Sequence, residues 1–450
     1  MKTFDKAYPT YKSSGIEWIG DIPEKWEIKK LKLLGEAITG LTYSPNDVVD
    51  ENEGKLVLRA SNIKNGSIVY GDNVYVDMKI PNKLITRNGD ILICSRNGSR
   101  RLIGKCARID DESQGLTFGA FTTVFRSSYA NFLFYVFQSP LFTFQIGSFL
   151  TSTINQLTIG NLNSLQIPLP SINEQEKITS FLDKQTKEID DLINYKEKMV
   201  SLLEEKRQLI ITEAVTKGLN PNVKMKHSGV EWIGEIPEHW TIKKIKHIST
   251  FVGSGKTPKG GSEIYPESGV LFLRSMNVHY DGIRLKNIVH ITPEIDEDMR
   301  STRVKSKDVL LNITGASIGR SCIVPESLGK ANVNQHVCII RGNTRVVVPE
   351  LLSKIMSSNF IMQQILMSQN GSSREGLNFT QVKNLECPLT RDLHEQIEIA
   401  NHISVETDKV NSLISMIKQQ IQKLKDYRQS LIYEAVTGKI DVRDFEIESE

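Results

Sequence analysis

The stretch of the chain that comes nearest to a cofactor site is the glycine-rich run at residues 251–255, Phe-Val-Gly-Ser-Gly. It matches the Phe-x-Gly-x-Gly pattern of methyltransferase cofactor loops. Such enzymes also need an Asn/Asp/Ser-Pro-Pro-Tyr/Phe motif, and the sequence contains no Pro-Pro dipeptide. Extended to Thr257, the run approaches a phosphate-binding loop, but Thr250 stands where that motif requires glycine. We therefore interpret the run as a flexible basic loop.

Histidine and cysteine side chains give no sign of a metal centre or a nucleophile. His227, His239, His247 and His336 have no cysteine or carboxylate at metal-ligand spacing. The five cysteines form no Cys-x-x-Cys pair, and most lie in apolar runs, as buried thiols of a reducing cytosol do. There is no signal-peptide pattern and no apolar stretch long enough to cross a bilayer. The sequence predicts a cytoplasmic chain without catalytic residues, without a metal and without a cofactor of its own.

Positive charge gathers in two stretches, although the net charge of the chain is only +3. Residues 241–261 contain five lysines and no acid, and residues 95–108 contain four arginines, one lysine and no acid. Clusters of this kind can meet the phosphates of a nucleic acid. They are also common on solvated surfaces, so charge alone leaves both interpretations open.

Two long helices are predicted to position these loops. Ser171 and Glu174 form a Ser-x-x-Glu capping box that predicts a helix start, and Asp392 and Glu395 occupy the same positions in the second half of the chain. Each helix is expected to run for about 43 residues, or ~64 Å. The glycines that predict the two helix ends are Gly218 and Gly438.

Apolar residues recur at alternating spacings of four and three in both helices. This pattern predicts a narrow seam that needs a partner helix. Because the helices belong to matching halves of the chain, we expect them to pair with each other as an antiparallel coiled coil; pairing with a helix of another chain is the alternative. The predicted core of the helix pair is Ile178, Leu182, Ile189, Leu192, Met199, Leu203, Ile210, Ile399, Ile403, Val410, Leu413, Ile417, Leu424 and Leu431.

The chain contains two copies of one unit. Residues 12–32 and 226–246 are identical at 15 of 21 positions, at an offset of 214, and Glu-Ala-Val-Thr at residues 213–216 returns at residues 434–437. A period this long indicates duplicated domains. The repeated block holds all four tryptophans, which could stack on bases. Their identical placement in both copies favours packing of this leading segment onto its own domain or onto the helix pair.

Two mixed regions accompany the helices, and each combines short apolar strands with a helical stretch. The predicted strands are residues 56–59, 90–94, 122–126, 270–274, 308–311 and 337–341, and the helical stretches are residues 131–149 and 349–368. Both regions carry an Arg-x-x-Asn motif, beginning at Arg59 and Arg274, whereas the intervening loops differ in length and sequence. The frame is therefore duplicated and the loops have diverged, which is expected of two recognition heads with different targets.

The predicted fold class is α+β, with two mixed α/β target-recognition domains separated by two long antiparallel helices in an internal pseudo-twofold repeat. The predicted segments are residues 1–170 for the first domain, 171–218 for the central helix, 219–391 for the second domain, and 392–450 for the C-terminal helix and acidic tail.

These features resemble the DNA-specificity subunits of type I restriction–modification systems over essentially the whole chain. The resemblance is carried by the repeated Ser-Gly-Ile/Val-Glu-Trp-Ile-Gly-x-Ile-Pro-x-x-Trp block, by Ile-Pro-Leu-Pro at residues 167–170 leading into a long helix, and by the Glu-Ala-Val-Thr exit. One departure is residues 387–390, where Cys-Pro-Leu-Thr replaces the Ile-Pro-Leu-Pro form.

The resemblance implies a division of labour among subunits. Each recognition domain would read one half of a split, asymmetric site in double-stranded DNA, and the helices would fix the gap between the halves. Two methyltransferase (modification) subunits would dock on the helices and methylate adenine N6 with S-adenosylmethionine. Motor and nuclease (restriction) subunits would cleave unmodified DNA with ATP and Mg²⁺. The specificity chain itself would not be catalytic.

Base readout needs side chains with fork or amide geometry, and phosphates need Lys or Arg. The divergent polar loops supply the candidate DNA-contact residues. In the first domain these are Thr42, Tyr43, Ser44, Ser95, Arg96, Asn97, Ser99, Arg100, Arg101, Thr151 and Ser152. In the second domain they are Ser254, Lys256, Thr257, Lys259, Thr314, Ser317, Arg320, Asn370, Ser372, Ser373 and Arg374. The alternative functions are a coiled-coil scaffold that bridges partners without reading DNA, and a self-sufficient methyltransferase.

Overall fold

The chain divides into two compact units in a computed structural model that describes residues 6–150, 155–258, 265–369 and 376–446. Unit 1 comprises Met1–Glu197 and Gln419–Glu450, and unit 2 comprises Lys198–Lys418. Each unit thus combines one mixed domain, called domain 1 or domain 2 below, with half of each long helix. The predicted division, which gives the helices segments of their own, stays a prediction.

The two long helices are α4 (Ile172–Lys217) and α10 (Leu393–Val436). The capping box at the start of α4 is present, with the Ser171 hydroxyl donating to the Glu174 carboxylate at 2.7 Å. At α10 the capping box is not reciprocal, because Asp392 accepts from the His394 N–H at 2.9 Å while Glu395 is turned elsewhere. A glycine with φ of +71° follows each helix, Gly218 directly after α4 and Gly438 two residues after α10, and glycine adopts this conformation without steric cost.

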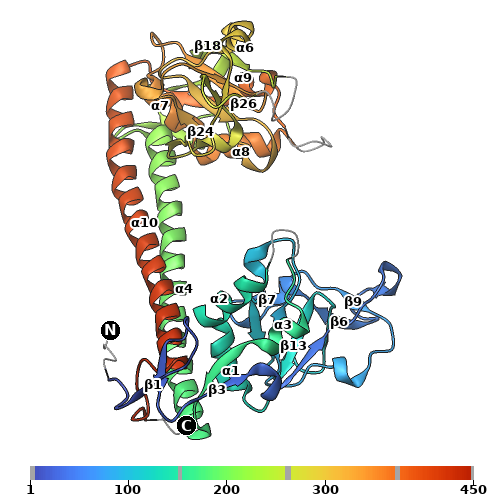
Figure 1. Cartoon of the computed structure of the whole chain (residues 1–450). Helices are drawn as coiled ribbons and strands as arrows, with labels where there is room; N and C mark the ends of the chain where they lie inside the picture. The colour runs from blue at the N-terminus through green and yellow to red at the C-terminus, as the bar shows by residue number, and fades with distance from the viewer. Residues whose placement is uncertain (1–5, 151–154, 259–264, 370–375, 447–450) are drawn as a thin grey trace. The chain divides into compact units, whose positions relative to one another are not determined.

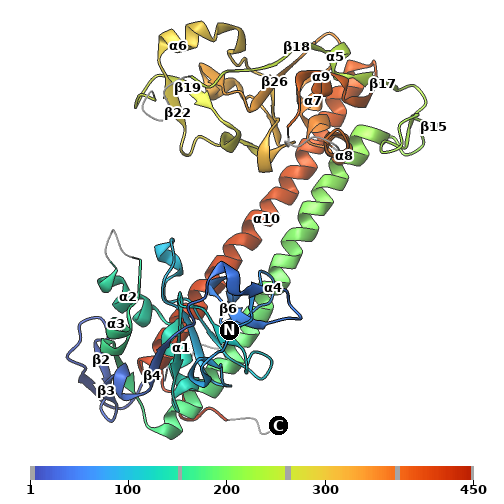
Figure 2. The same ribbon diagram turned by 90° about the vertical axis from the view of Figure 1, so that its right-hand side faces the viewer.

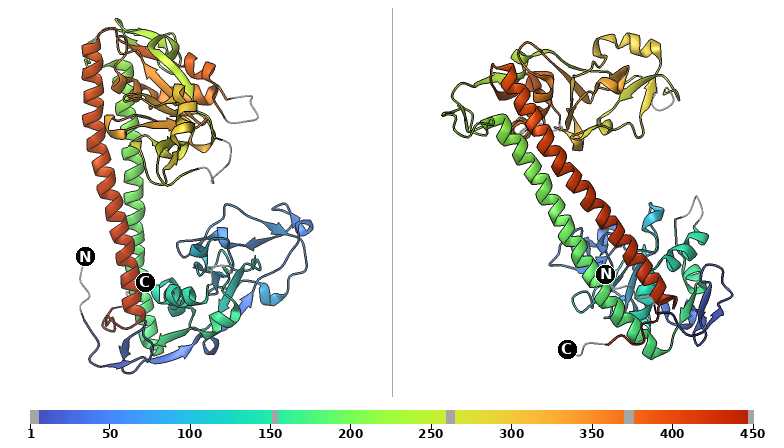
Figure 3. Two further views of the ribbon diagram at one scale, coloured as in Figure 1. Left: turned by 45° about the horizontal axis from the view of Figure 1, so that its top comes forward. Right: turned by 90° about the vertical axis from the view of Figure 1, so that its left-hand side faces the viewer.

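Within each unit the two half-helices run antiparallel. In unit 1, Asp190 pairs with Arg428 at 2.9 Å and Glu197 with Lys425 at 3.2 Å, so residue numbers fall on one helix as they rise on the other. In unit 2, Arg207 donates to Asn411 at 2.9 Å, with the same sense. Figure 3 shows α4 in green beside α10 in red. The predicted antiparallel pairing within the chain is therefore confirmed.

The buried face of these helices departs from the predicted seam at two positions. Leu192 and Leu413 are 41% and 44% exposed, whereas the next residues, Ile193 and Ile414, are each 7% exposed. A straight α-helix drifts by about 20° per heptad relative to a strict four-three spacing, so a seam read at that spacing leaves the buried face. Leu192 and Leu413 therefore do not belong to the core.

The other predicted core residues are mostly enclosed. The buried ones are Ile178, Leu182, Ile189, Ile399, Ile403, Val410, Ile417, Leu424 and Leu431. The half-buried ones are Met199, Leu203 and Ile210.

Domain 1 is built on two four-stranded sheets, in the orders β11-β10-β13-β4 and β12-β6-β9-β5. The first is antiparallel, and in the second β12 pairs with β6 in parallel. Its strands are β1 (Tyr11–Ser13), β2 (Asp21–Pro23), β3 (Glu27–Lys30), β4 (Glu36–Thr39), β5 (Val48–Val49), β6 (Lys55–Leu58), β7 (Ile63–Lys64), β8 (Ser67–Ile68), β9 (Tyr75–Val76), β10 (Ile91–Cys94), β11 (Cys106–Arg108), β12 (Thr117–Phe118), β13 (Thr122–Arg126) and β14 (Gln166–Leu169). The three predicted strands of this half are present as β6, β10 and β13.

Three helices complete domain 1: α1 (Ala130–Gln138), α2 (Pro140–Phe149) and α3 (Ile159–Ser164). The helical stretch predicted at residues 131–149 is two helices, because Ser139 is extended and Pro140 begins α2. Helix α1 binds the half-helices of its unit, because the Tyr135 hydroxyl donates to Asp183 at 2.6 Å and Arg428 donates to Gln138 at 3.2 Å. Figure 1 accordingly shows α1 and α2 nearer to α4 than β9 is.

Domain 2 repeats this architecture. Its sheets have the orders β24-β23-β26-β18 and β25-β19-β22, and β25 again pairs with β19 in parallel. Its strands are β15 (Met225–His227), β16 (Glu235–Pro237), β17 (Thr241–Lys244), β18 (Ser249–Ser254), β19 (Val270–Leu273), β20 (Val278–His279), β21 (Gly282–Ile283), β22 (Val289–Ile291), β23 (Val309–Asn312), β24 (Ser321–Ile323), β25 (Ala331–Val333), β26 (Val337–Gly342) and β27 (Glu386–Leu389). The predicted strands are present as β19, β23 and β26.

The helices of domain 2 are α5 (Ile245–Ile248), α6 (Pro293–Asp298), α7 (Pro349–Met356), α8 (Asn359–Met367) and α9 (Phe379–Asn384). The single helical stretch predicted at residues 349–368 is two helices, because Ser358 adopts an extended conformation and its hydroxyl donates to the carbonyl of Ile355 at 2.6 Å. In Figure 2, α6, β19 and β22 lie on the side of domain 2 away from α10.

The repeated tryptophan block ties each domain to the start of its long helix. Trp26 is fully buried, and its indole N–H donates to Glu174 at 3.3 Å. Trp240 is 2% exposed and donates to Glu395 at 3.0 Å. Packing of the leading segments, rather than exposure to a ligand, is therefore confirmed for these two tryptophans; Trp18 is 43% exposed.

Unit 1 is closed by two segments far apart in the sequence. The Tyr11 hydroxyl donates to the carbonyl of Gly438 at 3.0 Å, and the Asp441 N–H donates to the carbonyl of Lys6 at 2.7 Å. The ring of Phe445 packs edge-on against Phe181. In unit 2 the corresponding contact is continuous in sequence, since Gly218 at the end of α4 lies against Trp240.

Candidate nucleic-acid interface

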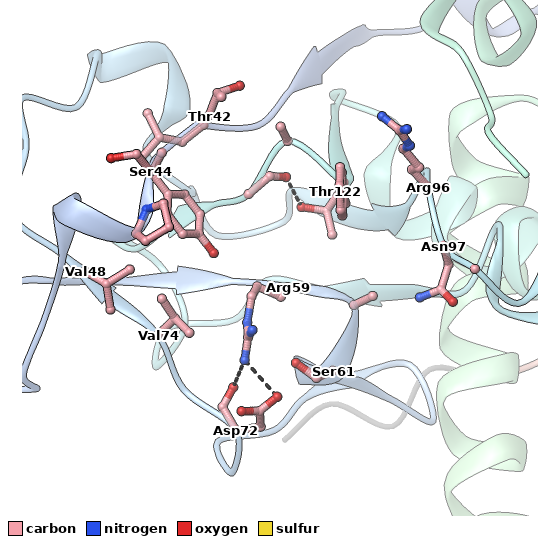
Figure 4. Close-up of a pocket in the computed structure, with 18 of the residues that line it drawn as sticks. Thr42, Ser44, Val48, Arg59, Ser61, Asp72, Val74, Arg96, Asn97 and Thr122 are labelled. Atoms are coloured by element: carbon pink, nitrogen blue, oxygen red, sulfur yellow. Dashed lines mark hydrogen bonds and ion pairs between the residues drawn. The ribbon is translucent and has the colours of Figure 1, made fainter.

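Domain 1 contains an open cleft of about 1400 Å³, formed by the loops that follow β4, β6, β10 and β12. Figure 4 shows Thr42 and Ser44 at one end and Arg96 and Asn97 at the other, with Arg59 between them. The described lining residues contribute two arginines and a single carboxylate, together with amides and hydroxyls. Forked and amide side chains of this kind can read the polar edges of base pairs.

Arg59 is positioned by a tight turn at the end of β6. The Asn62 side chain is 1% exposed and accepts from the Arg59 backbone N–H at 2.9 Å. The guanidinium Nη2 donates to the carbonyl of Asp72 at 2.6 Å and lies 2.8 Å from its carboxylate. The charge of Arg59 is thus largely offset by Asp72 within the domain.

Arg96 is held differently, by an aromatic ring. Its guanidinium carbon lies 5.1 Å from the centroid of the Phe121 ring, and its backbone N–H donates to the Phe121 carbonyl at 3.0 Å. Phe121 is 58% exposed, so the stacked pair faces the open cleft. A guanidinium stacked on an aromatic face is stabilised and kept planar to it.

Domain 2 carries other side chains at these two positions. The loop after β23 places Thr314 where domain 1 has Arg96, and the loop after β25 places His336 where domain 1 has Phe121. The preceding residue makes the same backbone bond in both domains, because the N–H of Ser95 donates to the Phe121 carbonyl and the N–H of Ile313 donates to the His336 carbonyl, each at 3.0 Å. The Thr314 hydroxyl and the His336 Nδ1 lie 2.7 Å apart, within hydrogen-bonding distance.

Domain 2 also has an arginine, Arg274, at the position equivalent to Arg59. Arg274 begins the same turn, in which Asn277 accepts from its backbone N–H at 3.0 Å. Its Nη2 donates to the carbonyl of Asn287 at 2.7 Å. An amide therefore replaces the carboxylate of Asp72, and Arg274 keeps its net positive charge at this contact.

The predicted DNA-contact residues of domain 1 separate into three groups. Those that line the cleft are Thr42, Tyr43, Ser44, Arg96 and Asn97. Ser95 is 6% exposed and its hydroxyl donates to the Phe121 carbonyl at 3.1 Å, so it faces inward and fixes the loop. Ser99, Arg100 and Arg101 are not among the residues that line the cleft, and Arg100 instead donates to the carbonyl of Gly147. Thr151 and Ser152 lie outside the described residues.

The predicted residues of domain 2 that the structure describes lie at the end of β18 and in the loops after β18 and β23. Lys256 and Thr257 are exposed after β18, where Ser254 is half-buried. Thr314, Ser317 and Arg320 are half-buried around the turn after β23, and Ser317 accepts from Asn312 at 3.1 Å. The others, which lie outside the described residues, are Lys259, Asn370, Ser372, Ser373 and Arg374.

Arg59 and Phe121 line the cleft but were not among the predicted residues. The sequence does single out Arg59, since its Arg-x-x-Asn motif recurs at Arg274. We interpreted that repetition as part of the duplicated fold, not as a sign of DNA contact. No sequence feature indicates Phe121, because its place in the cleft depends on the parallel pairing of β12 with β6, about 60 residues earlier in the chain.

No group of three or more His, Cys, Asp or Glu side chains among the described residues is placed to hold a metal ion. Burial raises the pKa of the Cys106 and Cys387 thiols to about 12, which keeps them protonated and unreactive at neutral pH. No helix in the described ranges combines the length and apolarity that a bilayer crossing requires.

Comparison with known proteins agrees with the duplicated fold. The sequence model of the type I restriction modification DNA specificity domain matches twice, at residues 23–200 and 237–423. A solved chain from work on complex assembly and conformational transition of the type I R-M system superposes with a TM-score of 0.65 at 16% identity, covering 92% of this chain and 98% of that one.

Relatives of known name support the same assignment. The EcoKI specificity subunit of Escherichia coli K12 is 22% identical over 94% of this chain and 90% of its own length. The putative MjaX specificity subunit of Methanocaldococcus jannaschii is 25% identical over 94% and 96%. For the EcoBI specificity subunit of Escherichia coli the match is 25% identical and spans 64% of this chain and 61% of that subunit. The chain belongs to the type I restriction–modification DNA specificity family. Its role is that of the DNA-recognition subunit.

Proposed function

We propose that domains 1 and 2 each read one half of a bipartite, asymmetric DNA sequence. The observation that carries this proposal is the pair of loops joined by the same backbone bond in both domains, which present Arg96 and Phe121 in one and Thr314 and His336 in the other. A duplicated frame that read one repeated sequence would have no reason to change its side chains there. Different readers on one frame fit two different half-sites.

The helix pair would set the distance between the half-sites. In DNA-binding dimers the protein's own geometry fixes half-site spacing. Here each domain is joined to its half-helices by side-chain bonds, such as Tyr135 to Asp183 in unit 1. A change in helix length would therefore change the number of base pairs between the half-sites rather than the bases read.

The outer faces of the helices would dock two modification subunits. Leu192 and Tyr195 on α4 are 41% and 63% exposed, and the residues 221 positions later, Leu413 and Met416 on α10, are 44% and 51% exposed. Residues three apart share one face of a helix. Two matching apolar patches at equivalent positions suit two copies of one partner, with restriction subunits joining that assembly to cleave DNA.

The chemistry would belong to those partners. S-adenosylmethionine, ATP and Mg²⁺ would bind to modification and restriction subunits, while this chain, working in the cytoplasm, would supply only base and phosphate contacts. Equilibrium dialysis of the isolated chain with S-adenosylmethionine tests this division. Specific, stoichiometric binding would contradict it.

A domain exchange tests the two-head function directly. Residues 219–391 are replaced by the second recognition domain of another family member, the chain is co-expressed with its modification subunit, and host DNA is read by modification-sensitive long-read sequencing. We expect one half of the methylated sequence to change and the other to stay. The matched control exchanges residues 1–170 and should change the opposite half. A change in both halves, or in neither, would contradict the proposal.

A further inference from the structure

We propose that Arg96, stacked on Phe121, reads a guanine in the half-site of domain 1, and that Thr314 and His336 make domain 2 read a different base at the equivalent point. This inference rests on the proposed function, since it requires domain 1 to bind a DNA half-site. It adds the identity of one base and of the side chains that select it.

The first argument is the freedom of the Arg96 guanidinium to bind a ligand. Arg96 is exposed, and its side chain makes no ion pair or hydrogen bond with the described residues; its recorded contact is the Phe121 ring at 5.1 Å. Arg59, in the same cleft, has its Nη2 committed to Asp72. The donors of Arg96 are therefore available to a partner, while the nearest equivalent charge is already engaged.

The second argument is the way Arg96 is held. The bond from its N–H to the Phe121 carbonyl fixes the two loops together, and the inward-facing hydroxyl of Ser95 bonds to the same carbonyl. The aromatic ring then limits the positions that the guanidinium can take. A planar, oriented fork is the geometry that pairs with O6 and N7 of guanine in the major groove, and a lysine at this position could not supply it.

The third argument comes from domain 2, where Thr314 and His336 occupy the positions that Arg96 and Phe121 hold in these two loops. The Thr314 hydroxyl is short and lies 2.7 Å from the His336 Nδ1. Near the Gln335 side-chain nitrogen, at 3.4 Å, lies the one ring nitrogen that this contact leaves, Nε2. That nitrogen can make one hydrogen bond to a base edge, not the bidentate pair that guanine accepts from arginine. The two domains must therefore differ in preference at this point of contact.

A phosphate contact is the competing role for Arg96, and it predicts a different result. Loss of a phosphate contact weakens binding uniformly across sequences, whereas loss of a base contact relaxes preference at one position. The experiment uses the full chain in complex with its modification subunit. The methylated sequence of the wild-type complex is determined first, and binding is then measured to duplexes substituted at each position of the domain 1 half-site.

The test variants are Arg96→Gln and Phe121→Leu, and Arg87→Gln is the matched control, because Arg87 is an exposed arginine at the opposite end of β10 and does not line the cleft. We expect Arg96→Gln to reduce the preference for guanine at one position by about 5- to 150-fold and to leave the domain 2 half-site unchanged. Phe121→Leu should reduce the same preference by a smaller factor, since the arginine remains but loses its platform. Arg87→Gln should leave every base preference as in the wild type.

A base analogue locates the contact. Replacement of the recognised guanine by 7-deazaguanine removes the N7 acceptor, so it should weaken binding by the wild-type complex and have no further effect on Arg96→Gln. A uniform loss of affinity for all duplexes in Arg96→Gln would identify a phosphate contact and overturn the inference. An unchanged profile in a variant that still methylates the bipartite site would overturn it as well. If the wild-type complex recognises no bipartite site at all, the proposed function fails first.

Discussion

In domain 1 the carboxylate of Asp90 is 2% exposed and lies 2.7 Å from Arg126, and in domain 2 Asp308 is 1% exposed and lies 2.7 Å from Arg341. Each arginine also donates to a carbonyl of a neighbouring loop, that of Ile85 or Arg303. A few residues away, in the loops that adjoin the same strands, domain 1 carries Arg96 and Phe121 at the positions where domain 2 carries Thr314 and His336. The contrast teaches that buried pairs preserve the frame, so exposed loop side chains can change without loss of the fold.

The largest effect on stability is expected at the helix pair, where an exposed leucine is followed by a buried isoleucine in each long helix. Ile193→Asp would bury an unpaired charge between the half-helices of unit 1 and should lower the free energy of unfolding by about 3–5 kcal/mol. Ile414→Asp should do the same in unit 2. Urea unfolding followed by circular dichroism measures both.

The neighbouring substitutions are the controls for that prediction. Leu192→Asp and Leu413→Asp lie on exposed positions and should leave the unfolding midpoint nearly unchanged, while weakening retention of the modification subunit in a pull-down. If the two leucine variants unfolded as readily as the isoleucine variants, the assignment of the buried face would be wrong.

The two glycines that end the long helices should differ in their response to a single methyl group. Both have φ of +71°, which costs an alanine about 1–2 kcal/mol. A Cβ at Gly438 would also lie 2.4 Å from the Pro23 ring, whereas a Cβ at Gly218 would lie 3.3 Å from Trp240. We expect Gly438→Ala to cost about 2–4 kcal/mol and Gly218→Ala about 1 kcal/mol.

Hydrogen exchange of the full-length variants would assign each loss to its unit. Gly438→Ala should speed exchange in the residues that close unit 1, and Gly218→Ala should act on unit 2. Equal losses from the two substitutions would show that the closer approach at Gly438 relaxes without cost.

The smallest effect on stability is expected at two equivalent contacts between the long helices, one in each unit. Asp190 pairs with Arg428 in unit 1, and Asn411 accepts from Arg207 in unit 2, so the two pairs differ chiefly by one carboxylate. Asp190→Asn should cost about 0.5–1 kcal/mol, and Asn411→Asp should add a similar amount, since partly exposed ion pairs contribute little. Thermal unfolding at low and high salt checks this, because the Asp190 contribution should shrink with salt; a salt-independent difference would contradict the ionic origin.

Much of the frame could be predicted from sequence because its signals are local. The Ser171–Glu174 cap, the glycine helix ends and the apolar strand runs depend on near neighbours in the chain. The phase of the helix seam could not be read reliably, because Leu192 and Ile193 are both apolar and only the partner helix decides which is buried. The cleft was predicted in part: Arg96 lies in a basic run, but the ring beneath it is brought there by strand pairing between distant segments.

Unit 1 is formed by two segments that precede and follow unit 2 in the sequence, and this order has a consequence for biosynthesis. Unit 2 is continuous, so it can fold as soon as Lys418 has left the ribosome, whereas unit 1 lacks its α10 half and the segment that packs on Tyr11 until residues 419–446 are made. At roughly 5–20 residues per second, about 10–40 s separate synthesis of the first part of unit 1 from that of its last part. The domain made first is completed last, and during that interval the apolar surface that its α10 half will cover stays exposed.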